Sequence, residues 1–179
     1  MGTRPLVLLL LSSLAGSAMG LSCSHHDDPC AGGSCGCEGG DDCALDCVVS
    51  PCELDCTDLS NCDLACVDDC QATCEDLSNC RLDCQEDCTL VCDRLSDCDA
   101  ACGPRCDYAC RNVSNCDVAV GPESLVLCAQ VSNCDVDCFG AACRVTCDNV
   151  GNCNVRCLDL EGNEVGGPSQ EDDGTVVCG

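Results

Sequence analysis

The sequence predicts an all-β fold, a small disulfide-stapled parallel β-solenoid with coils of about 18 residues, because a fixed period of this kind is the signature of a repeat architecture. Three observations lead to this fold: a regular repeat, cysteines that recur four positions apart within it, and an apolar residue midway between them. The chain has 179 residues, of which 29 are cysteine. The first cysteines of successive units recur at a nearly constant interval and are Cys43, Cys62, Cys80, Cys98, Cys116, Cys134 and Cys153.

The residue between two cysteines distinguishes a strand from a helix. In segments such as CDLAC at 62–66 and CRLDC at 80–84, the midpoint is apolar and the flanking residues are mostly charged or small. A helix would turn the midpoint away from the cysteines, whereas a strand places all three on one face. The period of two therefore favours strands with the cysteines and the midpoint directed inward. A string of disulfide-linked short helices or turns is the alternative fold.

Each unit carries two such strands and a third segment of the form apolar–Ser–Asn. Two short strands cannot bury an interior alone, but stacked units can, with a rise of roughly 4.8 Å per coil. The apolar residue of the third segment is expected to point inward. The Asn or Asp that follows is expected at a corner with left-handed backbone, where stacked amides bond from coil to coil. These corner residues are Asn61, Asn79, Asp97, Asn115, Asn133 and Asn152.

One irregular unit indicates how the cysteines pair. Val120 and Ser124 replace its second and third cysteines together, which suggests that these two positions normally bond to each other. The first and fourth cysteines then pair either within a coil, as Cys62–Cys74, or with the next coil, as Cys74–Cys80, since a disulfide tolerates both separations. The predicted bridges across the short corner are Cys47–Cys52, Cys66–Cys70, Cys84–Cys88, Cys102–Cys106 and Cys138–Cys143.

The first twenty residues have the features of a signal peptide. Arg4 precedes the apolar run LVLLLL at 6–11, and the small residues Ala18 and Gly20 stand before the expected cleavage site. We therefore expect a secreted, extracellular protein that begins at Leu21, in which cysteines form disulfides. The expected organisation is a signal peptide at 1–20, an irregular cysteine-rich cap at 21–42, the repeat solenoid at 43–157, and an acidic, glycine-rich, mobile tail at 158–179 that contains Cys178.

The charge balance restricts the partners. There are 32 acidic residues against 7 basic ones, with a formal net charge of −25. This balance excludes nucleic acid and anionic membrane surfaces as direct partners and favours cations or basic extracellular surfaces. Membrane insertion is not expected, because no apolar stretch of membrane length is present. The odd number of cysteines leaves at least one thiol unpaired or available for an intermolecular disulfide.

One outward column of the predicted solenoid is a candidate metal site. Its members Asp99, Asp117 and Asp135 follow one another at the repeat spacing with no arginine between them. Carboxylates about 5 Å apart in water repel each other by about 1 kcal/mol, and a hard cation between them would remove that repulsion. Ca²⁺ is the candidate ion, and no cofactor is required. The alternative is a solvated acidic face without defined ion sites.

Arginines are expected to relieve the repulsion elsewhere. Arg81 falls one period from both Asp63 and Asp99, and Arg105 falls one period from both Asp87 and Glu123. The predicted role of these arginines is to separate acids that the stacking would otherwise bring together.

Catalysis is not expected. The only histidines, His25 and His26, precede the repeats, and the repeats contain no histidine that could activate a serine. Asn112, in the sequence Asn-Val-Ser, is the one N-glycosylation acceptor.

The inward cysteines give the architecture a resemblance to the small disulfide-filled solenoids of insect antifreeze proteins. Their repeat length differs, and their threonine-rich ice-binding face is missing here. The resemblance therefore implies a coil and not an ice-binding function.

The sequence thus favours a secreted, acidic, cysteine-rich repeat protein that acts as a structural, adhesion or matrix module and binds divalent cations. A secreted binding effector, such as a toxin, inhibitor or ligand that recognises a basic surface, is the alternative. Metal sequestration by thiols is a second alternative.

Overall fold

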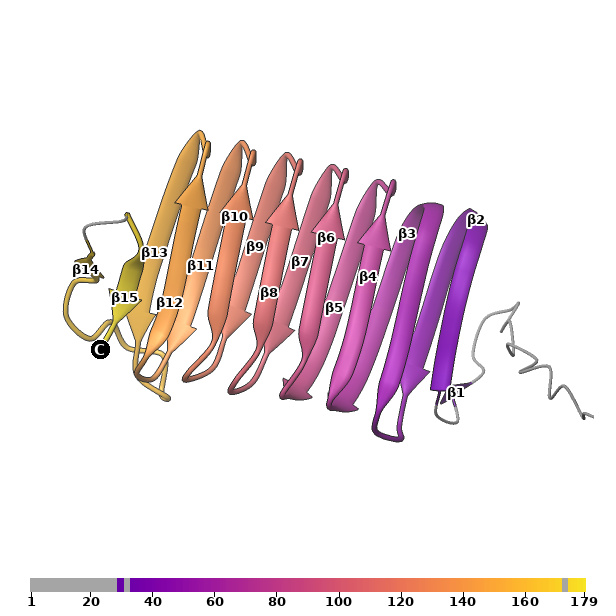
Figure 1. The fold of residues 1–179 in the computed structure, drawn as a ribbon, viewed down its shortest axis with the longest axis horizontal. Coiled ribbons are helices and arrows are strands. Elements are labelled where there is room, and N and C mark those ends of the chain that lie inside the picture. Colours follow the sequence, from indigo (N-terminus) through magenta and orange to yellow (C-terminus); the bar gives the residue numbers. More distant parts are fainter. Residues whose placement is uncertain (1–28, 31–32, 172–173) are drawn as a thin grey trace, which may run out of the picture.

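A computed structural model describes residues 29–30, 33–171 and 174–179, so the expected signal peptide and both histidines lie outside the described residues. The predicted fold is confirmed: the described chain is all β and forms a parallel solenoid, a rod of stacked coils (Figure 1). Within these ranges no helix is long and apolar enough to cross a membrane. The strands are β1 Pro29–Cys30, β2 Gly33–Cys47, β3 Cys52–Asp68, β4 Cys70–Glu75, β5 Asn79–Glu86, β6 Thr89–Asp93, β7 Asp97–Cys102, β8 Asp107–Arg111, β9 Asn115–Val120, β10 Leu125–Ala129, β11 Asn133–Phe139, β12 Cys143–Asp148, β13 Asn152–Leu158, β14 Ser169–Gln170 and β15 Val176–Cys178.

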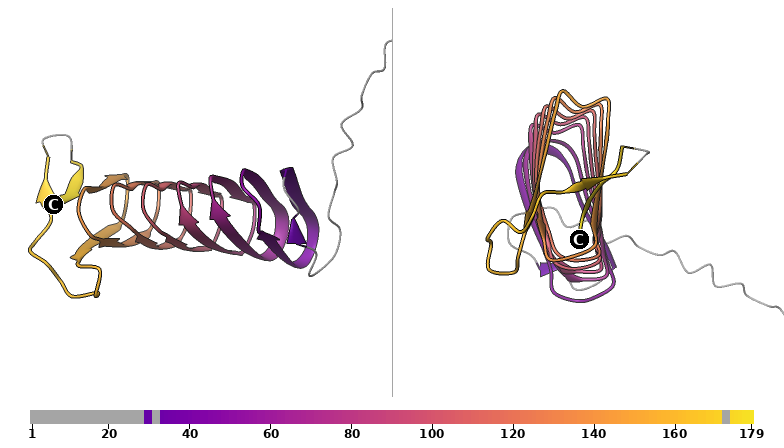
Figure 2. Two further views of the ribbon diagram at one scale, coloured as in Figure 1. Left: turned by 90° about the horizontal axis from the view of Figure 1, so that it is seen from below. Right: turned by 90° about the vertical axis from the view of Figure 1, so that its left-hand side faces the viewer.

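Each coil is a flattened loop with one strand on each long side, as the end-on view in Figure 2 shows. We call one side the first sheet: residues 61–68 of β3, then β5, β7, β9, β11 and β13. The other side is the second sheet: residues 52–57 of β3, then β4, β6, β8, β10 and β12. The strands pair in parallel register, so that Cys62 lies beside Cys80 and Cys80 beside Cys98. Equivalent residues of successive units therefore form columns along the rod.

The interior is built from the residues that the alternation directs inward. Leu64, Leu82 and Leu90 are all at most 2% exposed, and almost every cysteine beside such midpoints is buried. The apolar residues of the third segment also point inward, and Leu77 is 6% exposed. The chain has one Phe, one Tyr and no Trp. Cystine sulfur therefore takes the volume that large side chains fill in other small domains.

Disulfides close both corners of the coils. The structure has thirteen among the described residues, and they include all five that the irregular unit suggested, such as Cys66–Cys70. We call the short turn that these five bridges cross, from the first sheet to the second, the first corner. Of the two options for the remaining cysteines, the structure contains the link to the next coil, Cys74–Cys80, across the apolar–Ser–Asn segment, which we call the second corner. The other second-corner bridges are Cys37–Cys43, Cys56–Cys62, Cys92–Cys98, Cys128–Cys134 and Cys147–Cys153.

The left-handed backbone positions differ from the expectation. None of the predicted corner residues has a positive φ: Asn61 lies within β3, and the others, Asn79, Asp97, Asn115, Asn133 and Asn152, each begin a strand of the first sheet. Positive φ occurs three residues earlier in the second corner, as at Asp76 and Arg94, and again in the first corner, as at Asp87 and Arg105. In the second corner the left-handed residue therefore directly precedes the inward apolar residue, as Asp76 precedes Leu77, instead of following it.

The irregular coil replaces a bridge by packing and a hydrogen bond. Val120 is 1% exposed and Ser124 is fully buried, where its hydroxyl accepts a hydrogen bond from the backbone N–H of Cys106 at 3.1 Å. Gly121 is required beside them, because a Cβ there would lie 2.6 Å from the carbonyl carbon of Gly103. This coil keeps the path of its neighbours without a first-corner disulfide.

Both ends of the rod differ from the expected boundaries. The coil pattern already includes β2, which pairs in register with β3 from Gly33 onward, so part of the expected irregular cap is solenoid. The segment expected as a mobile tail folds back: β15 pairs antiparallel with β12, and Cys178 bonds to Cys157. The disulfide and the backbone ladder together hold this segment over the last coil.

Candidate cation-binding face

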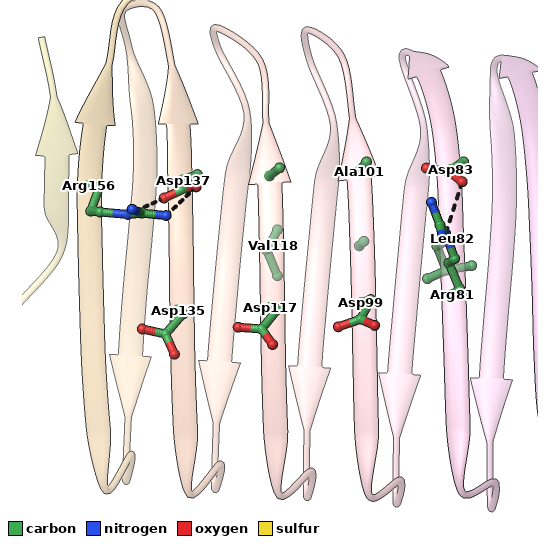
Figure 3. Close-up of a pocket in the computed structure, with 12 residues that line it drawn as sticks. Arg81, Leu82, Asp83, Asp99, Ala101, Asp117, Val118, Asp135, Asp137 and Arg156 are labelled. Carbon is green, nitrogen blue, oxygen red and sulfur yellow. Dashed lines mark hydrogen bonds and ion pairs between the residues drawn. The ribbon is translucent and has the colours of Figure 1, made fainter. Parts of the chain in front are cut away.

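The three predicted metal residues lie side by side on the first sheet. Strand register places Asp117 of β9 between Asp99 of β7 and Asp135 of β11. The close-up shows the three carboxylates at one level on adjacent strands (Figure 3). All three side chains are exposed. We call these three residues the carboxylate ladder.

A shallow groove runs beside the ladder. Its floor is formed by the small side chains of Ala101 and Ala119, which stand in the neighbouring outward column on β7 and β9. Asp83 and Asp137 occupy the same column on the flanking strands and border the groove. Small residues at its centre leave the ladder carboxylates accessible from the side.

Arginines stand at both ends of the groove but do not bond to the ladder. Arg81 is a register neighbour of Asp99, yet its ion pair is with Asp83 on its own strand, at 3.3 Å. Arg156 of β13 pairs with Asp137 at 2.6 Å. The expected placement of Arg81 between two acids is present in the register, but its charge is directed toward the groove border. Within the described chain, no arginine therefore forms an ion pair with a ladder carboxylate.

The electrostatic environment of the ladder is most adverse at its centre. Partial burial, together with the charges of Asp135 and Asp99, raises the pKa of Asp117 above its ordinary value. Asp135 accepts a hydrogen bond from the side-chain amide of Asn154 at 3.1 Å. Among the described residues, no donor bonds to the carboxylates of Asp99 and Asp117. Two of the three ladder carboxylates are thus uncompensated.

A column of side-chain amides runs beside the ladder, as the sequence predicted. Asn133 donates to Asn115 at 2.9 Å, and Asn152 donates to Asn133 at 2.8 Å. Similar bonds link Asn115 to Asp97 at 2.7 Å and Asn79 to Asn61 at 2.7 Å. These bonds fix the stacking of the coils next to the ladder and hold its carboxylates at the coil spacing.

Acids at two of the corners, unlike those of the ladder, form ion pairs with an arginine. Arg94 forms ion pairs with Glu75, with Asp76 at 2.7 Å and with Asp93 at 2.6 Å. The hydrogen bond from Arg94 holds the pKa of Asp76 below its ordinary value. Arg94 follows Asp76 by one period, the same spacing at which Arg105 follows Asp87.

The second corner arginine acts in the same way. Arg105 pairs with Glu86 and with Asp87, each at 2.7 Å, and its hydrogen bond lowers the pKa of Asp87. The uncompensated carboxylates therefore lie on the first sheet and not at these two corners.

The glycosylation acceptor lies on an exposed corner. Asn112 has a φ of 54° in the second corner that follows β8, and its side-chain nitrogen donates to Asp93 at 2.7 Å. The position is outward, as expected.

The cysteines do not offer a thiolate metal site in the described chain. Five groups of three sulfurs lie within 4.8 Å of one another, but each contains at least one intact disulfide pair, as in the group of Cys84, Cys88 and Cys102. Metal ligation requires thiolates, and disulfide sulfurs are not thiolates. Twenty-six of the described cysteines are bridged and two, Cys110 and Cys116, are buried thiols.

The groove was not predicted from the sequence. The signal was present in the same repeat: the second flanking residue of each strand gives the column Asp83, Ala101, Ala119, Asp137 and Arg156. The predicted site rested on the first flanking column alone, which contains neither the alanine floor nor the pair between Asp137 and Arg156.

Comparison of the chain with protein-family models, with curated proteins and with solved structures found no match.

Proposed function

We propose that the protein is an extracellular structural or binding module, a disulfide-stapled rod whose first sheet presents the carboxylate ladder to divalent cations or to basic surfaces. The cysteine-rich repeat fold with many disulfides is typical of extracellular modules. The observation that carries the proposal is the ladder itself: adjacent carboxylates at coil spacing, two of them without a donor, beside a groove with a small-residue floor.

Calcium is the favoured cation on chemical grounds. It accepts several carboxylate oxygens in flexible geometry, whereas Mg²⁺ demands a near-octahedral set. Neighbouring ladder carboxylates repel by about 1 kcal/mol per pair in water, and sodium screens this repulsion without occupying a defined position. A cation bound between two coils would in addition link them, because its ligands come from different repeats.

The test compares melting temperatures in calcium and sodium at equal ionic strength, with the disulfides intact. Ligand that binds only the folded state raises stability, by about 2.7 kcal/mol at a hundredfold excess over Kd. We expect calcium to raise Tm more than sodium does, and the triple variant Asp99→Asn, Asp117→Asn, Asp135→Asn to lose this difference.

A matched variant controls for net charge. Glu53→Gln, Asp107→Asn and Asp148→Asn remove the same number of charges from exposed positions elsewhere. This variant is expected to keep the calcium-specific shift. Equal shifts by calcium and sodium in the unmodified protein would exclude calcium binding at the ladder, leaving a solvated acidic face.

A more localised binding function has one observation in its favour. The irregular coil carries Leu125, which is 49% exposed on the second sheet, with the half-buried Leu127 beside it. An effector would concentrate its binding there, whereas a distributed module would not. Deleting residues 81–98 removes one regular coil with two complete bridges, Cys84–Cys88 and Cys92–Cys98.

The deletion is compared with Leu125→Asp in binding to a polylysine-coated surface. For the distributed module we expect both variants to retain most of the binding, in proportion to the remaining acidic coils. Loss of binding by Leu125→Asp alone would favour the effector. The proposal includes no catalytic step.

A further inference from the structure

One second corner lacks the bridge that its equivalents contain. Cys110 lies near the end of β8, and Cys116 follows the first residue of β9. Every other described pair at this position is a disulfide, with Cα–Cα separations of 6.4 to 6.6 Å. Both thiols are buried, with exposed fractions of 0% and 1%.

The register neighbours of these two thiols are themselves joined by disulfides. Cys110 lies between Cys92 and Cys128 on the second sheet. Cys116 lies between the bonded partners of those two residues, Cys98 and Cys134, on the first sheet. The corner is therefore flanked on both sides by closed disulfides of the same type.

The Cys116 thiol also lies beside the only tyrosine of the chain. The hydroxyl of Tyr108 donates to Cys98 Sγ at 3.1 Å and lies 3.4 Å from Cys116 Sγ. Tyr108 is 2% exposed and fills the coil interior where other units have Leu, Val or Ala. The two thiols and Tyr108 are thus buried together in the interior of this coil.

We propose that Cys110 and Cys116 are an oxidation site and form a fourteenth disulfide across this corner. The oxidant is an external organic disulfide. The Cys110 thiolate attacks one of its sulfurs and releases the first external thiolate. Cys116 then attacks Cys110 in the mixed disulfide and releases the second. The two protein thiols lose two protons and two electrons in total, and the external disulfide is reduced to two thiols.

The bridge forms before the coil closes. Thiol–disulfide exchange requires a thiolate and access for the oxidant. In the folded coil, the hydrogen bond with Cys110 and burial raise the pKa of Cys116 well above its ordinary value. A chain that folds as the dithiol is therefore kept in that state, since neither oxidant nor thiolate is available inside.

The bridge determines whether the middle of the rod is stapled. Val120 and Ser124 remove the first-corner disulfide of this coil, so the stretch 107–127 contains no bridged cysteine without Cys110–Cys116. With the bridge, every coil between β2 and β13 has at least one staple. The remaining cysteine of the sequence is then Cys23, which lies outside the described residues.

Peptide mapping of the whole secreted chain tests the proposal. The protein is denatured without reductant, alkylated at once with iodoacetamide and cleaved after arginine. Because Arg111 lies between the two cysteines, a bridge joins the peptides on either side of this cleavage site. We expect Cys110 and Cys116 unlabelled and linked. Label on both in the denatured, unreduced chain would overturn the proposal.

The substitution Cys110→Ser changes the number of iodoacetamide labels in opposite directions for the bridged protein and for the dithiol. If the bridge exists, Cys110→Ser leaves Cys116 unpaired, and the number of labels per denatured chain rises by one. If the unmodified protein holds a dithiol, the same substitution lowers the number by one. Cys128→Ser, which opens the neighbouring Cys128–Cys134 bridge, is the matched control and raises the number by one. A fall with Cys110→Ser would reject the fourteenth bridge.

Discussion

The two sheets of the solenoid have the same interior and different exteriors. On the inside, each strand contributes a cysteine, an apolar midpoint and, in most coils, a second cysteine. On the outside, the first sheet carries aspartate and asparagine columns. The second sheet has two mixed outward columns, in neither of which two acids are neighbours: Asp55, Thr73, Val91, Ala109, Leu127 and Thr146 in one, and Glu53, Gln71, Thr89, Asp107, Leu125 and Arg144 in the other.

This difference separates the requirements of stacking from those of binding. Stacking is served by the inward residues, which are buried on both sheets from β3 to β11. Apart from the amide column, the outward residues take no part in the packing of the interior, so each sheet can have its own chemistry. A repeated carboxylate is disfavoured by its neighbours one coil away, and the second sheet, which lacks such a column, avoids that cost. The ladder on the first sheet is therefore the better candidate for a functional surface.

The largest expected effect tests whether the two interiors are equivalent. Leu82→Ala on the first sheet and Leu90→Ala on the second each remove a side chain that is 1% exposed. Each variant should lower the free energy of unfolding by about 2–5 kcal/mol, because it loses buried apolar contacts and leaves a cavity. Denaturant titration with the disulfides intact measures this change. Leu125→Ala, at an exposed position, should cost less than about 1 kcal/mol. If only one of the two buried-leucine variants cost as little as Leu125→Ala, the two sheets would contribute unequally to stability.

An intermediate effect is expected in the amide column, which only the first sheet has. Asn133→Ala removes two side-chain hydrogen bonds, one to Asn115 and one from Asn152. The free energy of unfolding should fall by about 1 kcal/mol, since net contributions of such bonds are modest. Thr89→Ala, at an exposed position of the second sheet, is the control and should change stability by no more than about 0.5 kcal/mol. Equal effects would mean that the amide column does not stabilise the stack.

The smallest expected effect is a change in Tm at neutral pH, which has opposite signs for an aspartate of the ladder and an aspartate of a corner. Asp117 has a raised pKa in the folded state, so the folded chain binds its proton more readily and stability falls as pH rises through the carboxylate range. Asp117→Asn should therefore raise Tm at neutral pH, by an amount equivalent to less than about 1 kcal/mol because the group is exposed.

The corner variant should behave in the other direction. Asp87 has a lowered pKa beside Arg105, so its stabilisation is present at neutral pH and is lost as pH falls through the folded-state pKa. Asp87→Asn should slightly lower Tm at neutral pH, and both differences should vanish in acid. Melting curves measured across the acidic range test this pair. Shifts of the same sign would show that the ladder and the corner do not differ electrostatically.

Much of the fold was predictable because it depends on local periodicity. The alternation in segments such as 62–66 and 80–84 indicates strands, since no other regular structure places two cysteines and their midpoint on one face. The joint replacement by Val120 and Ser124 indicated which cysteines face each other across the first corner. The Asp99, Asp117 and Asp135 column followed from the same period. These features require only the spacing of residues along the chain.

Other features depend on distances between residues that the spacing leaves open. Cys74 was equally compatible with Cys62 and with Cys80, because the two options differ by about one coil rise. The partner of Arg81 was also open, since a long side chain at an exposed position reaches either along its strand or across to the next. Its bond to Asp83 leaves Asp99 without a cation. The sequence showed that these groups are neighbours but not which neighbour each contacts.

From its sequence alone, this protein is determined to be a stack of strands with cysteine inside and acid outside, because polarity with a period of two and a repeat of nearly constant length admit few other arrangements. The tertiary structure decided the rest: the bridge from each coil to the next, the left-handed position within each corner, the return of β15 over the last coil, and the partner of Arg81, which bonds to Asp83 and not to Asp99. These depend on where the backbone turns and which atoms then lie within bonding distance. That geometry arises only when the coils are stacked.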